Sequence, residues 1–154
     1  MIEIILYEQQ YAADFKSLNL EWLDKYNLTE SHDLEVLNDP KGTILDNGGC
    51  IFLAREGDEI AGSAALMKEH DEGVYELAKM TVMPKYQGKG ISKLLLQRCL
   101  QEAVHLQAKR ITLFSNHQLQ TALKLYEQFG FRHIPVEDSP FLTADVKMEL
   151  LLDK

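Results

Sequence analysis

The chain has 154 residues, of which 45% are hydrophobic and 26% are charged, and its formal net charge is −8. This length fits one domain with a sizeable core, so we expect a single domain over residues 1–154. The acidic balance argues against a general nucleic-acid binder, which needs a basic surface. No apolar run reaches the roughly 18–20 residues that cross a bilayer, so no membrane partner is expected.

The cysteines and histidines exclude further classes of protein. Cys50 and Cys99 provide neither a disulfide framework nor a metal-binding spacing. The five histidines are scattered and form no H-x-x-x-H pair, so we expect no metal. Residues 1–7 lack a basic leader region and are interpreted as a strand, not as a signal peptide. A reducing cytoplasm is therefore the simplest predicted location.

The first half of the chain alternates between apolar runs and strong turn signals. Apolar residues recur at helical spacing over residues 11–26, and short Gly-Asp and Asp-Glu-Gly turns separate three later strands, which we expect to pair antiparallel. In chain order the predicted elements are a strand at 2–7, a helix at 11–26, a short helix from Thr29 or Ser31 to a stop before Asp39-Pro40, a turn at 41–49, and strands at 50–55, 59–68 and 74–82.

The second half begins with a strand that enters a glycine-containing turn and then a long amphipathic helix. The apolar stripe of that helix comprises Ile91, Leu94, Leu95, Cys99, Leu100, Ala103 and Leu106. A strand at 110–115, a helix at 119–129 closed by Gly130, and strands at 131–134 and 142–152 follow. The order βααβββαβαββ predicts an α/β fold, a mixed sheet with helices on both faces.

The turn before the long helix has the features of an anion site. Backbone N–H groups at a helix N-terminus are unpaired and lie at the positive end of the helix dipole. Gly88 and Gly90 allow close approach of a ligand and tolerate positive φ, while Lys85 and Lys89 add positive charge. The pattern is neither a nucleotide P-loop nor a dinucleotide fingerprint. The alternative is that the glycines serve only a tight turn.

Two motifs resemble those of the GNAT family of acetyltransferases. The run Gln87-Gly88-Lys89-Gly90-Ile91-Ser92 is similar to the family's coenzyme A motif, Gln/Arg-x-x-Gly-x-Gly/Ala, with Ser92 in place of the last small residue. Residues 122–131 resemble a second motif, A-x-x-L-Y-E-x-x-G-F, about 35 residues further on. The resemblance implies a GNAT-like acyl-CoA N-acyltransferase fold with acetyl-CoA as cosubstrate, and its diagnostic part is residues 74–131.

The resemblance also implies which residues contact the cosubstrate. The end of the strand before the turn would hold the pantetheine arm and the thioester carbonyl, and the turn would hold the pyrophosphate. An Asn after the following strand often contributes, whereas Leu119 replaces a second family Asn. The implied cofactor-binding residues are Met80, Thr81, Val82, Gln87, Gly88, Lys89, Gly90, Ile91, Ser92 and Asn116.

Tyr126 and Glu76 are the candidate catalytic residues. Tyr126 matches the family tyrosine near the cofactor sulfur; because a tyrosine pKa of about 10 exceeds a thiol pKa of about 8.5, hydrogen bonding to the leaving thiolate is favoured over full proton transfer. Glu76 is the candidate base, acting through water, and strand alternation places it on the face of Val74, Ala78 and Met80. The alternatives are a core aromatic for Tyr126 and an ion-pair partner for Glu76.

The predicted function is acetyl transfer from acetyl-CoA to a primary amine of a small molecule or peptide. Direct attack in a ternary complex is expected, because neither cysteine has a positioned histidine partner. A non-catalytic acyl-CoA binding or sensing domain is the alternative, and the resemblance allows a homodimer through the last strands. Candidate acceptor contacts are Trp22, Tyr26, Glu30, His32, Asp33, Phe141 and Asp145.

Overall fold

The computed structural model describes residues 1–137 and 139–152, and within them a seven-stranded sheet runs in the order β1-β2-β3-β4-β5-β7-β6. The strands are β1 (Ile2–Leu6), β2 (Cys50–Glu56), β3 (Glu59–Lys68), β4 (Val74–Val82), β5 (Arg110–Ser115), β6 (Arg132–Ile134) and β7 (Val146–Leu151). The α-helices are α1 (Ala12–Lys25), α2 (Ser31–Asn38), α3 (Ile91–His105) and α4 (Gln120–Gln128). The predicted order of strands and helices and the mixed α/β class are confirmed. No helix in these two ranges is long and apolar enough to cross a membrane.

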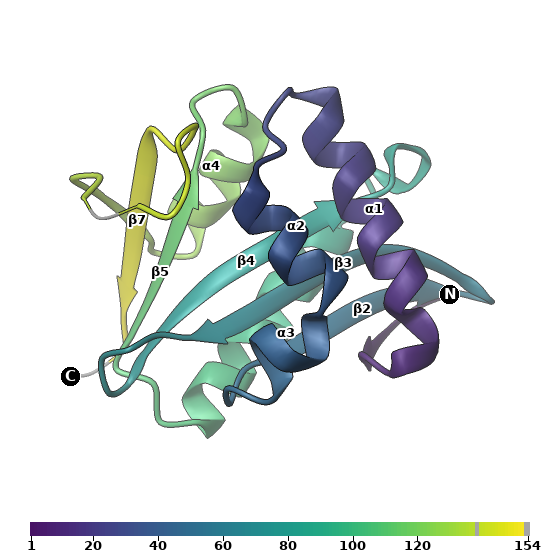
Figure 1. Ribbon diagram of the computed structural model, residues 1–154, viewed down its shortest axis with the longest axis horizontal. Coiled ribbons are helices and arrows are strands. Elements are labelled where there is room, and N and C mark those ends of the chain that lie inside the picture. The colour runs from purple at the N-terminus through teal and green to yellow at the C-terminus, as the bar shows by residue number, and fades with distance from the viewer. Residues whose placement is uncertain (138, 153–154) are drawn as a thin grey trace.

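Helices cover both faces of the sheet, because successive strand residues point to opposite sides. Helices α1 and α2 lie over one face and α3 over the other (Figure 1). On β2, Phe52 belongs to the core under α3, whereas its neighbour Leu53 belongs to the core under α1 and α2. The site described below lies between these two layers, where the sheet itself opens.

The opening arises because β4 and β5, the parallel pair in the sheet, separate after a short contact. They pair only from Val74 to Glu76 on β4, against Arg110 to Thr112 on β5. Beyond Glu76, β4 stays with β3 while β5 stays with β7. The Met83 N–H donates to the Ala61 carbonyl of β3 at 2.7 Å. Since strand N–H groups alternate in direction, the Val82 N–H points to the opposite edge, into the opening.

A bulge at Lys79 interrupts the alternation of β4. Lys79 has a φ of +53°, and the register with β3 shifts between the pairs Ala65–Ala78 and Ser63–Thr81. Ala78 therefore faces the α1 side with Glu76, while Met80 packs against the core under α3. The prediction that Glu76 and Met80 share a face is wrong, because the bulge inserts one residue between them.

Three predicted elements differ from the structure. Residues 41–45 form one turn of π-helix (Lys41–Leu45) in place of a simple turn, with the Asp46 N–H donating to the Lys41 carbonyl at 2.8 Å. On α3, Leu94 is 42% exposed and Leu96 is buried in its place. The last strand begins at Val146 and not at residue 142, because the backbone N–H groups of residues 142 and 143 donate to a side chain of the α1–α2 connection.

Candidate active site

The turn between β4 and α3 presents glycine backbone to open space. Gly88 and Gly90 have φ values of +80° and +79°, in the left-handed region that disfavours side chains, and Gly90 is the N-cap of α3. A Cβ built on either glycine would meet nothing within 4 Å. The turn is therefore shaped by backbone conformation and leaves room for a ligand at the α3 N-terminus, as an anion site requires.

A cavity of about 530 Å³, here called the outer cavity, runs from this turn along β4 to the start of α4. One buried polar atom in its wall, the Thr81 Oγ1, has no hydrogen-bond partner in the described ranges. Lys89 does not line the cavity; its ammonium lies 5.6 Å from the centroid of the Tyr86 ring. The predicted cofactor-binding residues in the wall are Met80, Thr81, Val82, Gln87, Gly88, Gly90, Ile91 and Ser92.

Sequence reasoning missed part of the outer cavity. The first residues of α4 and the loop before it contribute polar side chains, and the far rim is aromatic. Trp22 and Tyr26, on that rim, were predicted as acceptor contacts. The residues that the sequence did not indicate are Gln118, Gln120, Thr121 and Lys124. The position of α4 directly after the strand that separates from β4 could have indicated them, since both strands must border any opening between them.

A second cavity of about 120 Å³, the inner cavity, lies deeper in the opening. Its apolar wall comes from α1, β5 and the segment before β7, and its charged groups are Asp33, Glu76 and Lys79. The two cavities adjoin, because five residues line both of them. These residues are Trp22, Met80, Leu119, Ala122 and Tyr126.

Tyr126 stands at the junction of the two cavities and also belongs to the core. Its ring centroid lies 5.8 Å from that of Phe131, and 7% of the residue is exposed. Burial, with a smaller contribution from the nearby Cys99, raises the pKa of Tyr126 above its usual value. The hydroxyl is thus a poor proton donor to a thiolate and better suited to donating a hydrogen bond.

Glu76 is a buried carboxyl in the inner cavity, with 6% of the residue exposed. Burial and the neighbouring Glu69 carboxyl raise the pKa of Glu76 to about 8, against the opposing charges of Lys79 and Lys147. A carboxyl with such a pKa exchanges a proton near neutral pH, which suits a general base.

Lys79 is paired with Asp33 and not with Glu76. Its ammonium lies 2.5 Å from Asp33 Oδ1, with 6% and 3% of the two side chains exposed. The same ammonium lies 5.5 Å from the centroid of the Phe141 ring. Asp33 is held at the start of α2, where its Oδ2 accepts the Glu30 N–H at 2.9 Å. The alternative in which Glu76 serves as an ion-pair partner of Lys79 is therefore not supported, because that ammonium is paired with Asp33.

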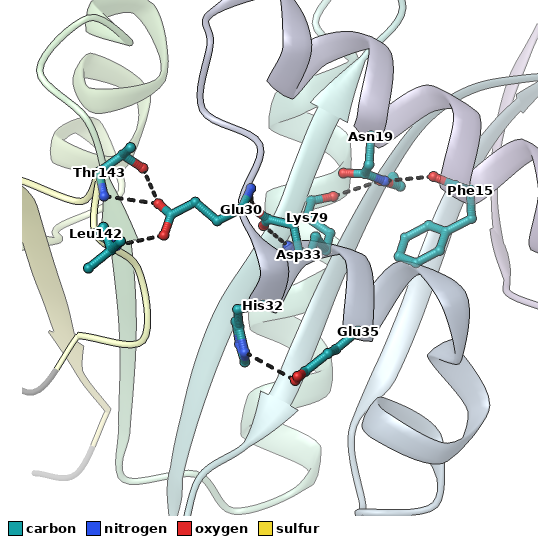
Figure 2. A network of polar contacts seen from close by, with 10 residues as sticks. Phe15, Asn19, Glu30, His32, Asp33, Glu35, Lys79, Leu142 and Thr143 are labelled. Atoms are coloured by element: carbon teal, nitrogen blue, oxygen red, sulfur yellow. Dashed lines mark hydrogen bonds and ion pairs between the residues drawn. The ribbon is translucent and has the colours of Figure 1, made fainter.

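Glu30 connects α2 to the segment before β7, as Figure 2 shows. Its carboxylate accepts the N–H groups of Leu142 at 2.6 Å and Thr143 at 2.9 Å, and also the Thr143 hydroxyl. Burial favours the neutral acid, but these hydrogen bonds outweigh it and hold the pKa of Glu30 below its usual value. We call this set of contacts the Glu30 clasp.

The predicted acceptor contacts divide into three groups. Trp22, Asp33 and Phe141 line the inner cavity, and Tyr26 lines the outer one. Glu30 and His32 lie behind the wall; the His32 ring packs edge-on against Phe141, with centroids 5.0 Å apart. Asp145 lies outside both cavities, and its carboxylate accepts the His117 N–H at 2.9 Å.

Asn116 lies in the inner cavity, away from the turn. Its Nδ2 donates to the Thr143 carbonyl at 2.8 Å and its Oδ1 accepts the Gln118 N–H at 3.0 Å. Both ends of the amide are therefore occupied by the fold, and its predicted contact with the cofactor stays a prediction.

The family model and the similar solved structures agree on one family of proteins. Residues 14–131 match the family model described as Acetyltransferase (GNAT) family. A crystal structure of a GNAT acetyltransferase from Staphylococcus aureus has a TM-score of 0.91 at 24% identity, covering 99% of this chain and 100% of that one. The yncA structure from Salmonella typhimurium, a putative acetyltransferase with its cofactor acetyl-CoA, has a TM-score of 0.78 at 20% identity over 100% of this chain and 95% of its own.

The matches to curated relatives cover a smaller part of each protein. Human N-acetylaspartate synthetase is 32% identical over 91 residues, which cover 59% of this chain and 30% of the synthetase. An uncharacterized N-acetyltransferase of Mycobacterium tuberculosis is 33% identical over 106 residues, covering 69% of this chain and 63% of that protein. The chain thus spans about a third of the length of the synthetases it matches.

The glycine turn at the end of β4 lies where the sequence motif that resembles the GNAT coenzyme A motif placed it. The chain belongs to this family, since the family model covers more than half of it. The predicted family and the predicted fold are confirmed.

Proposed function

We propose that this protein transfers the acetyl group of acetyl-CoA to a primary amine by direct attack in a ternary complex. The observation that carries the proposal is the pair of adjoining cavities in the opening between β4 and β5. The outer one leads from the anion-binding turn, and the inner one contains a buried carboxyl of raised pKa. The outer cavity would hold the donor and the inner cavity the amine. Because the two cavities share part of their wall, this arrangement supports a direct reaction between two bound molecules.

The residues of the outer cavity fit the donor. The open space above Gly88 and Gly90 accommodates phosphate oxygens against the first N–H groups of α3. The unpartnered Thr81 Oγ1 and the Val82 N–H supply polar groups for an extended arm with amide bonds. The Val82 N–H would also polarise a thioester carbonyl placed in the opening.

The chemistry requires a neutral amine, since an ammonium has no lone pair. Glu76 in its carboxylate form would accept a proton from the ammonium, directly or through water, and so leave a neutral amine. The amine nitrogen then forms a bond to the thioester carbon, the carbon–sulfur bond breaks, and the electron pair leaves with the sulfur. The nitrogen loses its second proton, which is taken up by the thiolate, so that an amide and free CoA thiol are formed. Tyr126 would donate a hydrogen bond to the departing thiolate from the junction of the two cavities.

The direct test is release of free CoA thiol from acetyl-CoA in the presence of a panel of primary amines, amino acids and polyamines. We expect amine-dependent thiol release above the rate of hydrolysis for at least one class. Binding of acetyl-CoA without thiol release for any amine would overturn catalysis and favour an acyl-CoA binding or sensing domain. Absence of acetyl-CoA binding would overturn both assignments.

A further inference from the structure

We infer that the acceptor is a small primary amine whose body carries no carboxylate, selected by the size of the inner cavity and by its charge. The inference rests on the proposed function and names the substrate class of the same site. It follows from three properties of the inner cavity: a small volume, a cation that is already paired, and an aromatic wall fixed by a side chain from another element.

The volume of the inner cavity limits the acceptor to a few heavy atoms near the amine. The cavity measures about 120 Å³, and an apolar protein cavity of about 150 Å³ binds benzene. A branched alkyl group therefore fits, whereas a larger ring system requires a wall to move. The walls are mainly apolar, with Trp22, Leu113, Phe114 and Phe141 among them, so an alkyl or small aromatic body is favoured.

The charges of the inner cavity disfavour an acidic acceptor. In the described ranges the cavity is lined by two carboxyl side chains, Asp33 and Glu76, and one ammonium, Lys79. That ammonium is 2.5 Å from Asp33 Oδ1 and is buried. A carboxylate on the acceptor would have to compete with Asp33 for the Lys79 ammonium. If the acceptor carboxylate gains no ion pair with Lys79, its burial in the cavity is unfavourable.

Two further basic side chains, Lys147 and His32, lie behind the aromatic walls of the cavity. The Lys147 ammonium lies 5.0 Å from the centroid of the Phe114 ring, and His32 packs edge-on against Phe141. Neither lines the cavity. As far as residues 1–137 and 139–152 show, the inner cavity thus offers a carboxyl base to an amine but no unpaired cation to a carboxylate.

The Glu30 clasp fixes the wall that sets the size limit. It fastens residues 142 and 143 to the start of α2 through backbone and hydroxyl hydrogen bonds. Phe141, the preceding residue, lies between His32, Phe114 and the Lys79 ammonium. The wall is therefore held from three sides, and Phe141 is the residue that we expect to exclude larger amines.

A matched series of acceptors separates charge from size. Isobutylamine, valinamide and valine share one branched side chain and differ in having no added group, a neutral carboxamide, or a carboxylate. With rates expressed per neutral amine, we expect kcat/KM for valine to be at least about 100-fold below that for valinamide, because a polar group left without its partner is strongly rejected. Equal values for valine and valinamide would overturn the role of charge.

The variant Asp33→Asn tests the paired cation. It frees the Lys79 ammonium, and its amide oxygen can still accept the Glu30 N–H that Asp33 accepts. We expect the ratio of kcat/KM for valine to that for isobutylamine to rise about tenfold. Glu35→Gln, which removes the same charge from an exposed position of α2, is expected to leave the ratio unchanged. Such a ratio is insensitive to the fraction of folded enzyme.

Phe141→Ala tests the size limit. The ratio of kcat/KM for 2-phenylethylamine to that for isobutylamine should rise about tenfold, since removal of the ring enlarges the inner cavity. An unchanged ratio would overturn the size limit. If amino acids prove to be the better acceptors of the unaltered protein, this inference fails while the proposed acetyl transfer stands. If no amine is acetylated, the proposed function itself fails.

Discussion

Removal of one oxygen atom from Tyr126 isolates its chemical role from its packing role. In Tyr126→Phe the ring still packs against Phe131, but the hydrogen bond proposed for the leaving thiolate is lost. We expect kcat to fall about 10–100-fold while the Kd for acetyl-CoA stays within about twofold, because the contact matters most as charge develops on sulfur. Single-turnover kinetics and equilibrium binding measure the two quantities.

Tyr75→Phe is the matched control for this change. Tyr75 is as buried as Tyr126 and belongs to the same core, but it lines neither cavity. If both variants lower kcat equally, the effect comes from the fold and the catalytic role of Tyr126 is refuted.

Glu76 makes the pH dependence of the reaction predictable. As a base it must lose its proton, so kcat/KM should rise with pH through the pKa of about 8. Glu76→Gln should remove this rising limb of the pH–rate profile and leave only the limb that reflects titration of the amine. Glu69→Gln should move the limb to lower pH, because the Glu69 carboxyl helps to raise that pKa. A profile that is identical in all three proteins would exclude Glu76 as the base.

At the scale of elements, the turn before α3 offers a comparison between two glycines. Gly88 and Gly57 both have positive φ, and a Cβ on either meets nothing within 4 Å. Replacement by Ala should cost each about 1 kcal/mol of stability, through the same left-handed strain. Only Gly88→Ala should weaken acetyl-CoA binding, by about tenfold or more, since only Gly88 lines the outer cavity. Calorimetric titration measures this, and equal affinities would argue against a phosphate site at the turn.

Strand β4 shows how far residue patterns determine the site. The glycine turn and the helix that follows it were predictable, because both depend on local backbone properties. The bulge was not, since Lys79 carries no turn signal and yet adopts a φ of +53°. The sheet face predicted for Met80 was wrong for that reason alone. The face predicted for Glu76 and Ala78, which precede the bulge, was correct.

The start of α2 illustrates a second limit. Sequence signals favoured Thr29 or Ser31 as its cap, but Glu30 is the N-cap. Its carboxylate hydrogen bonds to Thr143, which lies 113 positions further along the chain. Capping propensities depend on residues that are neighbours along the chain, so they cannot predict a hydrogen-bond partner at that sequence separation. The same bond explains why the last strand is shorter than predicted.

For the whole molecule, Glu76 links stability to pH. Its pKa is raised in the folded state from 4.5 to about 8, so between these values the native protein holds a proton that the unfolded chain has lost. The contribution of Glu76 to the free energy of unfolding is therefore fully present below pH 4.5 and is lost progressively as the pH rises to about 8.

Glu76→Gln should remove this dependence. We expect the variant to be more stable than the unaltered protein at pH 8.5 by on the order of 3 kcal/mol, and about equal to it near pH 4.5. Urea denaturation at the two pH values measures both differences. A variant that is less stable at pH 8.5 would mean that the ionised carboxylate is well compensated in the fold.

The short contact between β4 and β5 has a consequence for the protein before it meets its substrates. Three residue pairs join the sheet of β1–β4 to the sheet of β5–β7, so the molecule is nearly two half-sheets with one narrow seam. A donor that lies along the free edge of β4 would act as a surrogate strand and extend that seam. Catalytic competence and mechanical continuity of the sheet would then be acquired in the same binding event.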